Sequence, residues 1–213
     1  MLYSYKGKML KNTSVTVTDG TISITGGAFS GCSNLVSIII PDSVKSIGDG
    51  AFNGCSGLTN IIIPDSVTSI EDSLFEGCSG LTNITISDSV TYIDRCAFRN
   101  CVNLKNVTLS KNIKSISAYM FEKCTSLTSI VIPEGVTEIL YNSFNECSSL
   151  ANVTIPNTVK KIDAYSFSNC SNLSNITFNG TINEWNNITK SSTWNDSSNI
   201  QTITCSDGVI NLE

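Results

Sequence analysis

Residues 58–80 read LTNIIIPDSVTSIEDSLFEGCSG, and this stretch decides the fold because it recurs along the chain, with small changes, as a 23-residue unit. Its first part, residues 60–63, is rich in isoleucine and predicts a short strand. The following Pro64, Asp65 and Ser66 predict a turn, because proline fixes φ while Asp and Ser side chains bond nearby backbone.

The second half of the same unit closes the coil. Residues 67–70 hold an apolar pair and predict another short extended piece. Residues 71–78 have room for one or two helical or 3₁₀ turns, which Gly77 would end. Strand, turn and short helix within a single unit make one coil of a superhelix.

Four residue types recur at this spacing along the chain, which indicates an internal repeat and not an isolated motif. A period of this length, with strand and turn signals in each unit, predicts a solenoid. The repeating residues are Cys32, Cys55, Cys78, Cys101, Cys124, Cys147 and Cys170; Phe29, Phe52, Phe75, Phe98, Phe121, Phe144 and Phe167; Leu35, Leu58, Leu81, Leu104, Leu127, Leu150 and Leu173; and Ile47, Ile70, Ile93, Ile116, Ile139 and Ile162.

Stacking of the units follows from their apolar side chains. One coil cannot enclose its own Leu, Ile, Val and Phe, whereas stacked coils bury each against its copy in the next coil. Parallel strands of neighbouring coils would lie about 4.8 Å apart. We therefore expect an α/β solenoid, a right-handed superhelix with a parallel β-sheet on one face and short helical turns or loops on the other.

Residues 42–55, DSVKSIGDGAFNGC, make the unit resemble the BspA-like leucine-rich repeats of bacterial surface proteins. The resemblance extends over residues 12–178. It implies a leucine-rich-repeat superhelix and an adhesin-like role in binding host matrix or cell-surface proteins, and therefore an extracellular or cell-surface location. The residues after Met1 do not form a signal peptide, so we expect any signal to lie outside this chain.

The repeat divides the chain into three segments. Residues 1–11 are expected to be an N-terminal lead-in. Residues 12–172 would form the solenoid, with one partial and six full units, and residues 173–213 a degenerate repeat followed by a C-terminal cap.

The last segment departs from the 23-residue pattern. Counting onward places Trp185 in the isoleucine slot and Lys190 in the phenylalanine slot. We expect Trp185 and Trp194 to close the core, which is more consistent with their setting than ligand binding. Residues 201–212 carry a Ser-Asp-Gly turn between two apolar runs and predict a hairpin.

Composition excludes several function classes. The 213 residues carry a net charge of −5 and include no histidine. Triads built on histidine and His-ligated metals are therefore excluded, and a general nucleic-acid interface would need a basic footprint. No apolar run approaches the length needed to cross a membrane, roughly 18 residues, so we expect no membrane insertion. We expect no enzymatic activity and no cofactor.

The cysteine column is expected to be a row of free, buried thiols, because free cysteine packs as a small apolar residue. Copies stacked in parallel rarely reach the torsion of a disulfide, and a line of four thiols is not a tetrahedral zinc site. Cys96 and Cys205 lie outside the column. Cys96 is expected to be partly exposed, with Arg95 able to lower its pKa.

An acidic column follows the expected strands, with Asp42, Asp65 and Asp88 in equivalent slots. Stacked carboxylates would repel, which would suit a bound cation such as Ca²⁺. The alternative, which we favour, is that each Asp caps its own turn and faces solvent.

Two surfaces are candidates for partner binding. Alternation sends every second strand residue outward, which gives a field of Asn and Thr with apolar spots. The charge pattern supplies the other, because a stretch of bases without acids follows an acidic front and could steer a partner. The candidate residues are Asn60, Ile62, Asn83, Thr85, Asn106, Thr108, Val131, Asn152 and Thr154 on the strands, and Arg95, Arg99, Lys105, Lys111 and Lys114 in the basic stretch.

We therefore predict a non-enzymatic protein-interaction module, expected to be a monomer, that binds a protein ligand through its outward strand face. The alternative is a structural spacer or display array within a larger surface protein, with no ligand of its own. A third hypothesis, a two-carboxylate hydrolase, lacks a convergent acidic pair.

Overall fold

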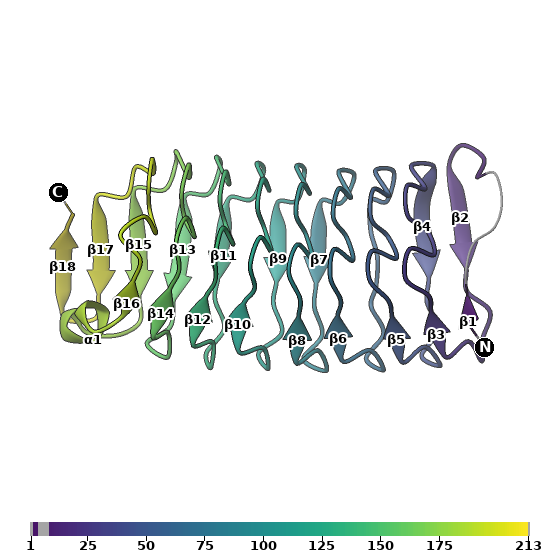
Figure 1. The fold of residues 1–213 in the computed structure, drawn as a ribbon, viewed down its shortest axis with the longest axis horizontal. Coiled ribbons are helices and arrows are strands. Elements are labelled where there is room, and N and C mark those ends of the chain that lie inside the picture. The colour runs from purple at the N-terminus through teal and green to yellow at the C-terminus, as the bar shows by residue number, and fades with distance from the viewer. Residues whose placement is uncertain (1, 4–8, 213) are drawn as a thin grey trace.

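The computed structural model describes residues 2–3 and 9–212 and shows a parallel-strand β-solenoid of about eight turns. The coils stack along one axis into a rod, with the two ends of the chain at opposite ends of the rod (Figure 1). Each regular coil has three sides: a longer strand, a shorter strand and a segment of turns. We call the stacks of these sides the long-strand row, the short-strand row and the turn row.

The long-strand row contains the strand predicted at the start of each unit. Parallel pairing keeps the 23-residue register between regular coils, as at Asn83↔Asn106 and Ser129↔Asn152. An antiparallel strand ends the row at the C-terminal side. Its strands are β2 (Thr13–Thr16), β4 (Leu35–Ile39), β7 (Asn83–Thr85), β9 (Asn106–Thr108), β11 (Ser129–Val131), β13 (Asn152–Ile155), β15 (Asn175–Phe178), β17 (Thr202–Cys205) and β18 (Gly208–Asn211).

The short-strand row is a second set of parallel ladders, so the expectation of a sheet on one face only was wrong. Each of its members has two residues, and in all but the first and last strand the second residue is the buried isoleucine of the unit, in register with its copy in a paired strand. The strands are β1 (Leu2–Tyr3), β3 (Ser23–Ile24), β5 (Ser46–Ile47), β6 (Ser69–Ile70), β8 (Tyr92–Ile93), β10 (Ser115–Ile116), β12 (Glu138–Ile139), β14 (Lys161–Ile162) and β16 (Thr189–Lys190).

The long-strand row is interrupted at two places. Residues 60–63, the strand expected in the unit quoted above, belong to no sheet and lie between β4 and β7. A second interruption separates β9 from β11, which belong to different sheets. The regular sequence repeat therefore does not produce a continuous hydrogen-bonded ladder.

The prediction of helical turns on the third side of the coil was wrong. Each segment of the turn row is a run of turns with hydrogen bonds to the next coil. The Phe52 amide, for example, donates to the Leu74 carbonyl at 3.1 Å. Two residues in each segment have positive φ, such as Ser73 at 56° and Gly77 at 71°. A right-handed helix requires negative φ throughout, so this backbone excludes one, and the α/β description does not hold.

The core runs along the centre of the rod and is built from the repeated columns. Leucine, isoleucine and cysteine members are almost all fully buried, and the phenylalanine rings form a stack. From Phe29 to Phe167, consecutive ring centroids lie 5.1–5.7 Å apart with interplanar angles of 4–15°. Offset stacking at this separation is a favourable arrangement for aromatic pairs.

The C-terminal end differs from the register counted on the sequence. The helix α1 (Ile182–Asn186) is inserted before the last short strand, so Lys190 and not Trp185 pairs with Ile162. Trp194 then packs against Phe167 in the phenylalanine slot. Both tryptophans are buried in the core, as predicted, and the predicted hairpin is present as β17 and β18.

Candidate interaction surfaces

The outward side of the long-strand row presents the predicted field of polar and aliphatic side chains. Alternation holds in the structure: Asn83 and Thr85 are exposed while Ile84 between them is buried. The three most exposed aliphatic side chains in this field are Ile39 at 64%, Ile62 at 75% and Val131 at 66%.

Shallow clefts lie where the ladder of the long-strand row is interrupted. Ile62 lines clefts on both of its sides, shared with Ile39 on one and with Asn83 and Thr85 on the other. A third cleft, between β9 and β11, is lined by Asn106, Thr108, Lys111, Val131 and Pro133 among others. Each of the three exposed aliphatic side chains therefore lines at least one cleft.

Polar side chains of the same field bond to one another across coils. The Asn106 amide donates to the Asn83 side-chain oxygen at 2.6 Å, and the Asn175 side-chain oxygen accepts from the Thr202 and Thr204 hydroxyls at 2.8 and 2.9 Å. Some of the Asn and Thr hydrogen-bonding capacity is thus used within the rod.

The basic stretch does not form one patch. Residues 95–114 span most of a coil, so their side chains lie on different sides of the rod. Arg95 and Arg99 lie on the turn row, Lys111 lies beside β9, and Lys114 precedes β10. Among described residues, Lys105 and Lys114 make no ion pair, whereas the other three pair with acids of neighbouring coils.

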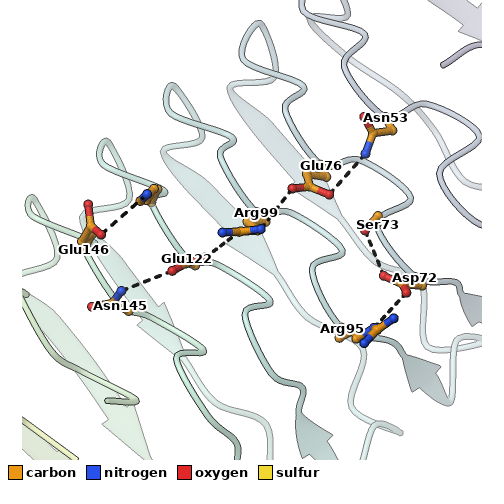
Figure 2. A network of polar contacts seen from close by, with 10 residues as sticks. Asn53, Asp72, Ser73, Glu76, Arg95, Arg99, Glu122, Asn145 and Glu146 are labelled. Atoms are coloured by element: carbon orange, nitrogen blue, oxygen red, sulfur yellow. Dashed lines mark hydrogen bonds and ion pairs between the residues drawn. The ribbon is translucent and has the colours of Figure 1, made fainter. Parts of the chain in front are cut away.

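Arg99 belongs to a polar ladder that follows the turn row, and Arg95 makes a separate contact with Asp72 (Figure 2). The Arg99 guanidinium lies 3.6 Å from Glu76 and donates through Nε to Glu122, whose side chain is nearly buried. The Asn53 and Asn145 amides extend the ladder by donating to Glu76 and Glu122 at 3.2 and 3.3 Å. This ladder links five successive coils and leaves Arg99 without a free charge for a partner.

Two members of the acidic column, Asp65 and Asp88, accept hydrogen bonds from the next coil and, in the described chain, not from their own turns, which differs from the expected capping. Asp65 accepts a hydrogen bond from the Ser87 hydroxyl at 2.5 Å, and Asp88 accepts from the Lys111 backbone N–H at 2.9 Å. The Lys111 backbone and ammonium groups lower the pKa of Asp88. No group of three or more acidic or cysteine side chains within residues 2–3 and 9–212 is placed to hold a metal ion.

The described cysteines are free thiols, and six members of the column are fully buried. Their Sγ atoms donate to phenylalanine carbonyls of the preceding coil, as from Cys78 to Phe52 at 3.1 Å. Burial raises the pKa of Cys55 to about 12. Burial, followed by the nearby acids Glu76 and Asp72, also raises the pKa of Cys96. Arg99 and Arg95 lower it, as expected of Arg95, but do not offset the rise.

Sequence reasoning missed an aromatic cluster on the turn row. The Tyr141 ring contacts the rings of Tyr119 and Tyr165, and the three residues lie on three successive coils. The 23-residue period does not reveal this cluster, because the position one period from both Tyr119 and Tyr165 is residue 142, and Tyr141 lies one residue before it. A search for exposed aromatic residues near, and not only on, the period would have found them.

Comparison with known proteins identifies the repeat. The family described as "BspA type Leucine rich repeat region" matches residues 2–125 and 93–213, with 6 copies. A leucine rich cell surface protein of Faecalibacterium prausnitzii is 31% identical over 84% of this chain and 63% of its own, with a TM-score of 0.62. A leucine-rich repeat protein of Bacteroides ovatus is 26% identical over 91% of this chain and 63% of its own, with a TM-score of 0.64.

A leucine rich repeat protein of T. pallidum is also similar, at 30% identity over 78% of this chain and 72% of its own, with a TM-score of 0.51. The chain spans less than two thirds of the F. prausnitzii and B. ovatus proteins. No curated protein matches the sequence. Within the described residues, no helix has the length and apolar character needed to span a membrane.

Proposed function

Because the chain belongs to the BspA-type leucine-rich-repeat family, we propose that it is a non-enzymatic protein-interaction module located at the cell surface or outside the cell. The location is supported by the F. prausnitzii relative, which is described as a cell surface protein. The role is supported by the fold, since a solenoid offers an extended surface whose residues vary independently of its core.

One observation carries the proposal: the three exposed aliphatic side chains Ile39, Ile62 and Val131 all line clefts of the long-strand row. Exposed aliphatic groups set among polar ones resemble the apolar core and polar rim of a protein interface. Burying such a side chain on binding contributes roughly 1.5–3 kcal/mol.

The proposed contact surface is the outward side of the long-strand row, and its partner is a host matrix or cell-surface protein, bound in an adhesin-like manner by a monomer. Lys111 joins this surface because it lines the cleft beside Val131. Lys105 and Lys114 would act by steering alone, and Arg95 and Arg99 would contribute least because they are ion-paired. The remaining contacts are Asn60, Asn83, Thr85, Asn106, Thr108, Asn152 and Thr154.

A specific observation also supports a spacer or display array within a larger protein. Outward polar side chains such as Asn83 and Asn106 bond to each other across coils. A surface that satisfies its own hydrogen bonds needs no partner, and the similar proteins are longer than this chain. In a spacer, the clefts would result only from the way the coils pack and would bind no partner.

Binding to immobilised fibronectin, fibrinogen, laminin and collagen, measured by biolayer interferometry at two salt concentrations, tests the proposal. We expect capture of one of these proteins and a loss of about tenfold or more in affinity for the double variant Ile39→Asp with Ile62→Asp. Ile22→Asp is the matched control, because Ile22 is also an exposed isoleucine, at 51%, but precedes the short-strand row. Absence of capture at micromolar concentration would favour the spacer.

A further inference from the structure

The tyrosine cluster lies where the short-strand row meets the turn row, apart from the surface proposed above. The ring centroids of Tyr119 and Tyr141 are 5.4 Å apart and those of Tyr141 and Tyr165 are 5.7 Å apart, with edge-to-face angles of 72° and 83°. Tyr141 is 39% exposed, and its two neighbours are partly exposed. The three rings form a platform across three coils.

The cluster forms because two neighbouring slots of the repeat alternate in size. The residues equivalent to Tyr141 in the two neighbouring coils are the small residues Ala118 and Ala164, which leave space for its ring. Tyr119 and Tyr165 share the next slot, where the backbone has φ of 59° and 58°. The result is one ring in each of three successive coils, alternating between two slots.

Polar groups around the rings are free to bond with a ligand. Among the described residues, no hydrogen bond engages the hydroxyl groups of Tyr119, Tyr141 and Tyr165. The side-chain amide of Asn142, in the slot between Tyr119 and Tyr165, is likewise without a partner in the described chain. An apolar platform is therefore combined with donors and acceptors that the rod itself does not use.

Charges near the platform are neutralised within the protein. Arg99 lies over the Tyr119 ring, 5.6 Å from its centroid, but is paired with Glu76 and Glu122. Arg95, in the same slot as Tyr141, is paired with Asp72 at 2.8 Å. Both of these arginines are therefore already engaged with acids of the described chain and are not available to select a charged ligand.

We propose that the three tyrosines form a binding site for an uncharged glycan chain. A pyranose ring has an apolar face of C–H groups and a rim of hydroxyl groups, which matches aromatic faces surrounded by tyrosine hydroxyls and an amide. The polar, uncharged setting fits a neutral sugar chain better than an anionic one. Arginine and tyrosine also mark protein interfaces, but here the arginines are engaged with acids.

The test is affinity gel electrophoresis of the purified protein in gels that contain hydroxyethyl cellulose, glucomannan, dextran or starch, with heparin as the charged comparator. We expect retardation by at least one neutral polysaccharide. Tyr141→Ala should weaken it about tenfold or more, whereas Tyr141→Phe, which keeps the ring and loses one hydroxyl, should weaken it less.

Tyr92→Ala is the matched control, because Tyr92 is exposed at 49% but makes no ring contact with the cluster. We expect its retardation to equal that of the original protein, and circular dichroism to show that all variants keep their fold. Absence of retardation by all four neutral polysaccharides, retardation by heparin alone, or an equal loss in Tyr92→Ala would overturn the proposal. A loss of matrix-protein capture in Tyr141→Ala without glycan binding would identify a protein site instead and would also overturn it.

Discussion

The middle and the C-terminal end of the rod bury aromatic rings in opposite ways. Along the middle, phenylalanine rings lie nearly parallel, as at Phe52 and Phe75 with an interplanar angle of 4°. At the end, Trp194 meets Phe167 at 87° and Trp185 at 68°. Phe178 also contacts Trp185 edge to face.

This difference follows from what each region must do. A coil that is translated onto the next presents the same ring face in each copy, so stacking can continue indefinitely. A stack that ended on a parallel ring would expose that face to water, whereas the two tryptophans turned on edge at this end are themselves buried. The end is therefore specified by residues that break the repeat.

Breaking the stack in the middle should give the largest effect. Phe98 is fully buried between Phe75 and Phe121, with centroids 5.5 Å away on both sides. Phe98→Ala should lower the free energy of unfolding by about 3–5 kcal/mol, because it leaves a cavity and removes two ring contacts. Urea unfolding followed by circular dichroism measures this.

Phe98→Leu is the control for that experiment, since it retains most of the volume and should cost less than the alanine variant. Equal unfolding midpoints for Phe98→Ala and the original protein would show that the column does not carry the stability assigned to it.

Breaking the end should have a smaller and local effect. Trp194→Ala removes the edge contacts to Phe167 and Trp185, and we expect a loss of about 2 kcal/mol confined to the last coil. Hydrogen exchange should show faster exchange within residues 178–205 and unchanged protection within residues 46–101. Equal deprotection of both regions would mean that the rod unfolds as one unit from either site.

The same contrast explains which features the sequence could predict. Columns such as Phe98 and Cys124 were placed correctly because translation by one repeat unit forces equivalent side chains into contact. The helical turns were wrong because non-glycine residues such as Ser73 and Tyr119 adopt positive φ, which composition does not reveal. Gly50 and Asn142 in the same slot were the available signal, since both residue types favour that conformation.

Departures from the period were the features that sequence counting missed. The insertion of α1 moved Lys190 into the slot assigned to Trp185. The available signal in the sequence was Thr181 with Glu184 three residues later, which form a capping box in the structure. The basic stretch looked contiguous because its members are close in sequence. In a solenoid, residues that are near in sequence lie around the coil, while spatial neighbours lie one repeat unit apart, as Arg95 and Asp72 do.

Two cysteines, Cys124 in the middle of the rod and Cys205 at its C-terminal end, should differ in how they make stability depend on pH. Burial holds the pKa of Cys124 well above its ordinary value of 9.0, and raises that of Cys205 less. Above pH 9 the unfolded chain loses a proton that the folded chain keeps, so stability falls as pH rises. Each fully buried thiol should contribute a slope of about 1.4 kcal/mol per pH unit.

Cys124→Ala should therefore make the decline in the free energy of unfolding between pH 9 and 10.5 less steep by nearly that amount, and Cys205→Ala by less. Urea titrations at several pH values measure both slopes. A loss of packing at the substituted site lowers the free energy of unfolding equally at every pH, so it does not change the slope. Identical slopes for the two variants would contradict the difference in burial.

The smallest effects on stability are expected from substituting two aspartates that accept backbone hydrogen bonds. One lies at the end of the rod and one in the middle, and the loss should be larger at the end. Asp207 accepts from the Ile182 N–H at 2.8 Å and ties the last hairpin to the first residue of α1. Asp207→Ala should cost about 1 kcal/mol and speed exchange in α1. Urea unfolding and hydrogen exchange measure the two effects.

Asp88 is the matched residue in the middle, where it accepts from the Lys111 N–H. The coils on both sides already hold this segment, and water can replace the exposed carboxylate. Asp88→Ala should therefore leave the unfolding midpoint unchanged. Any contribution of Asp88 should vanish in acid, because its lowered pKa stabilises the fold only above the ordinary carboxyl pKa. If the two variants lose equal stability, the end of the rod depends no more on individual side chains than the middle does.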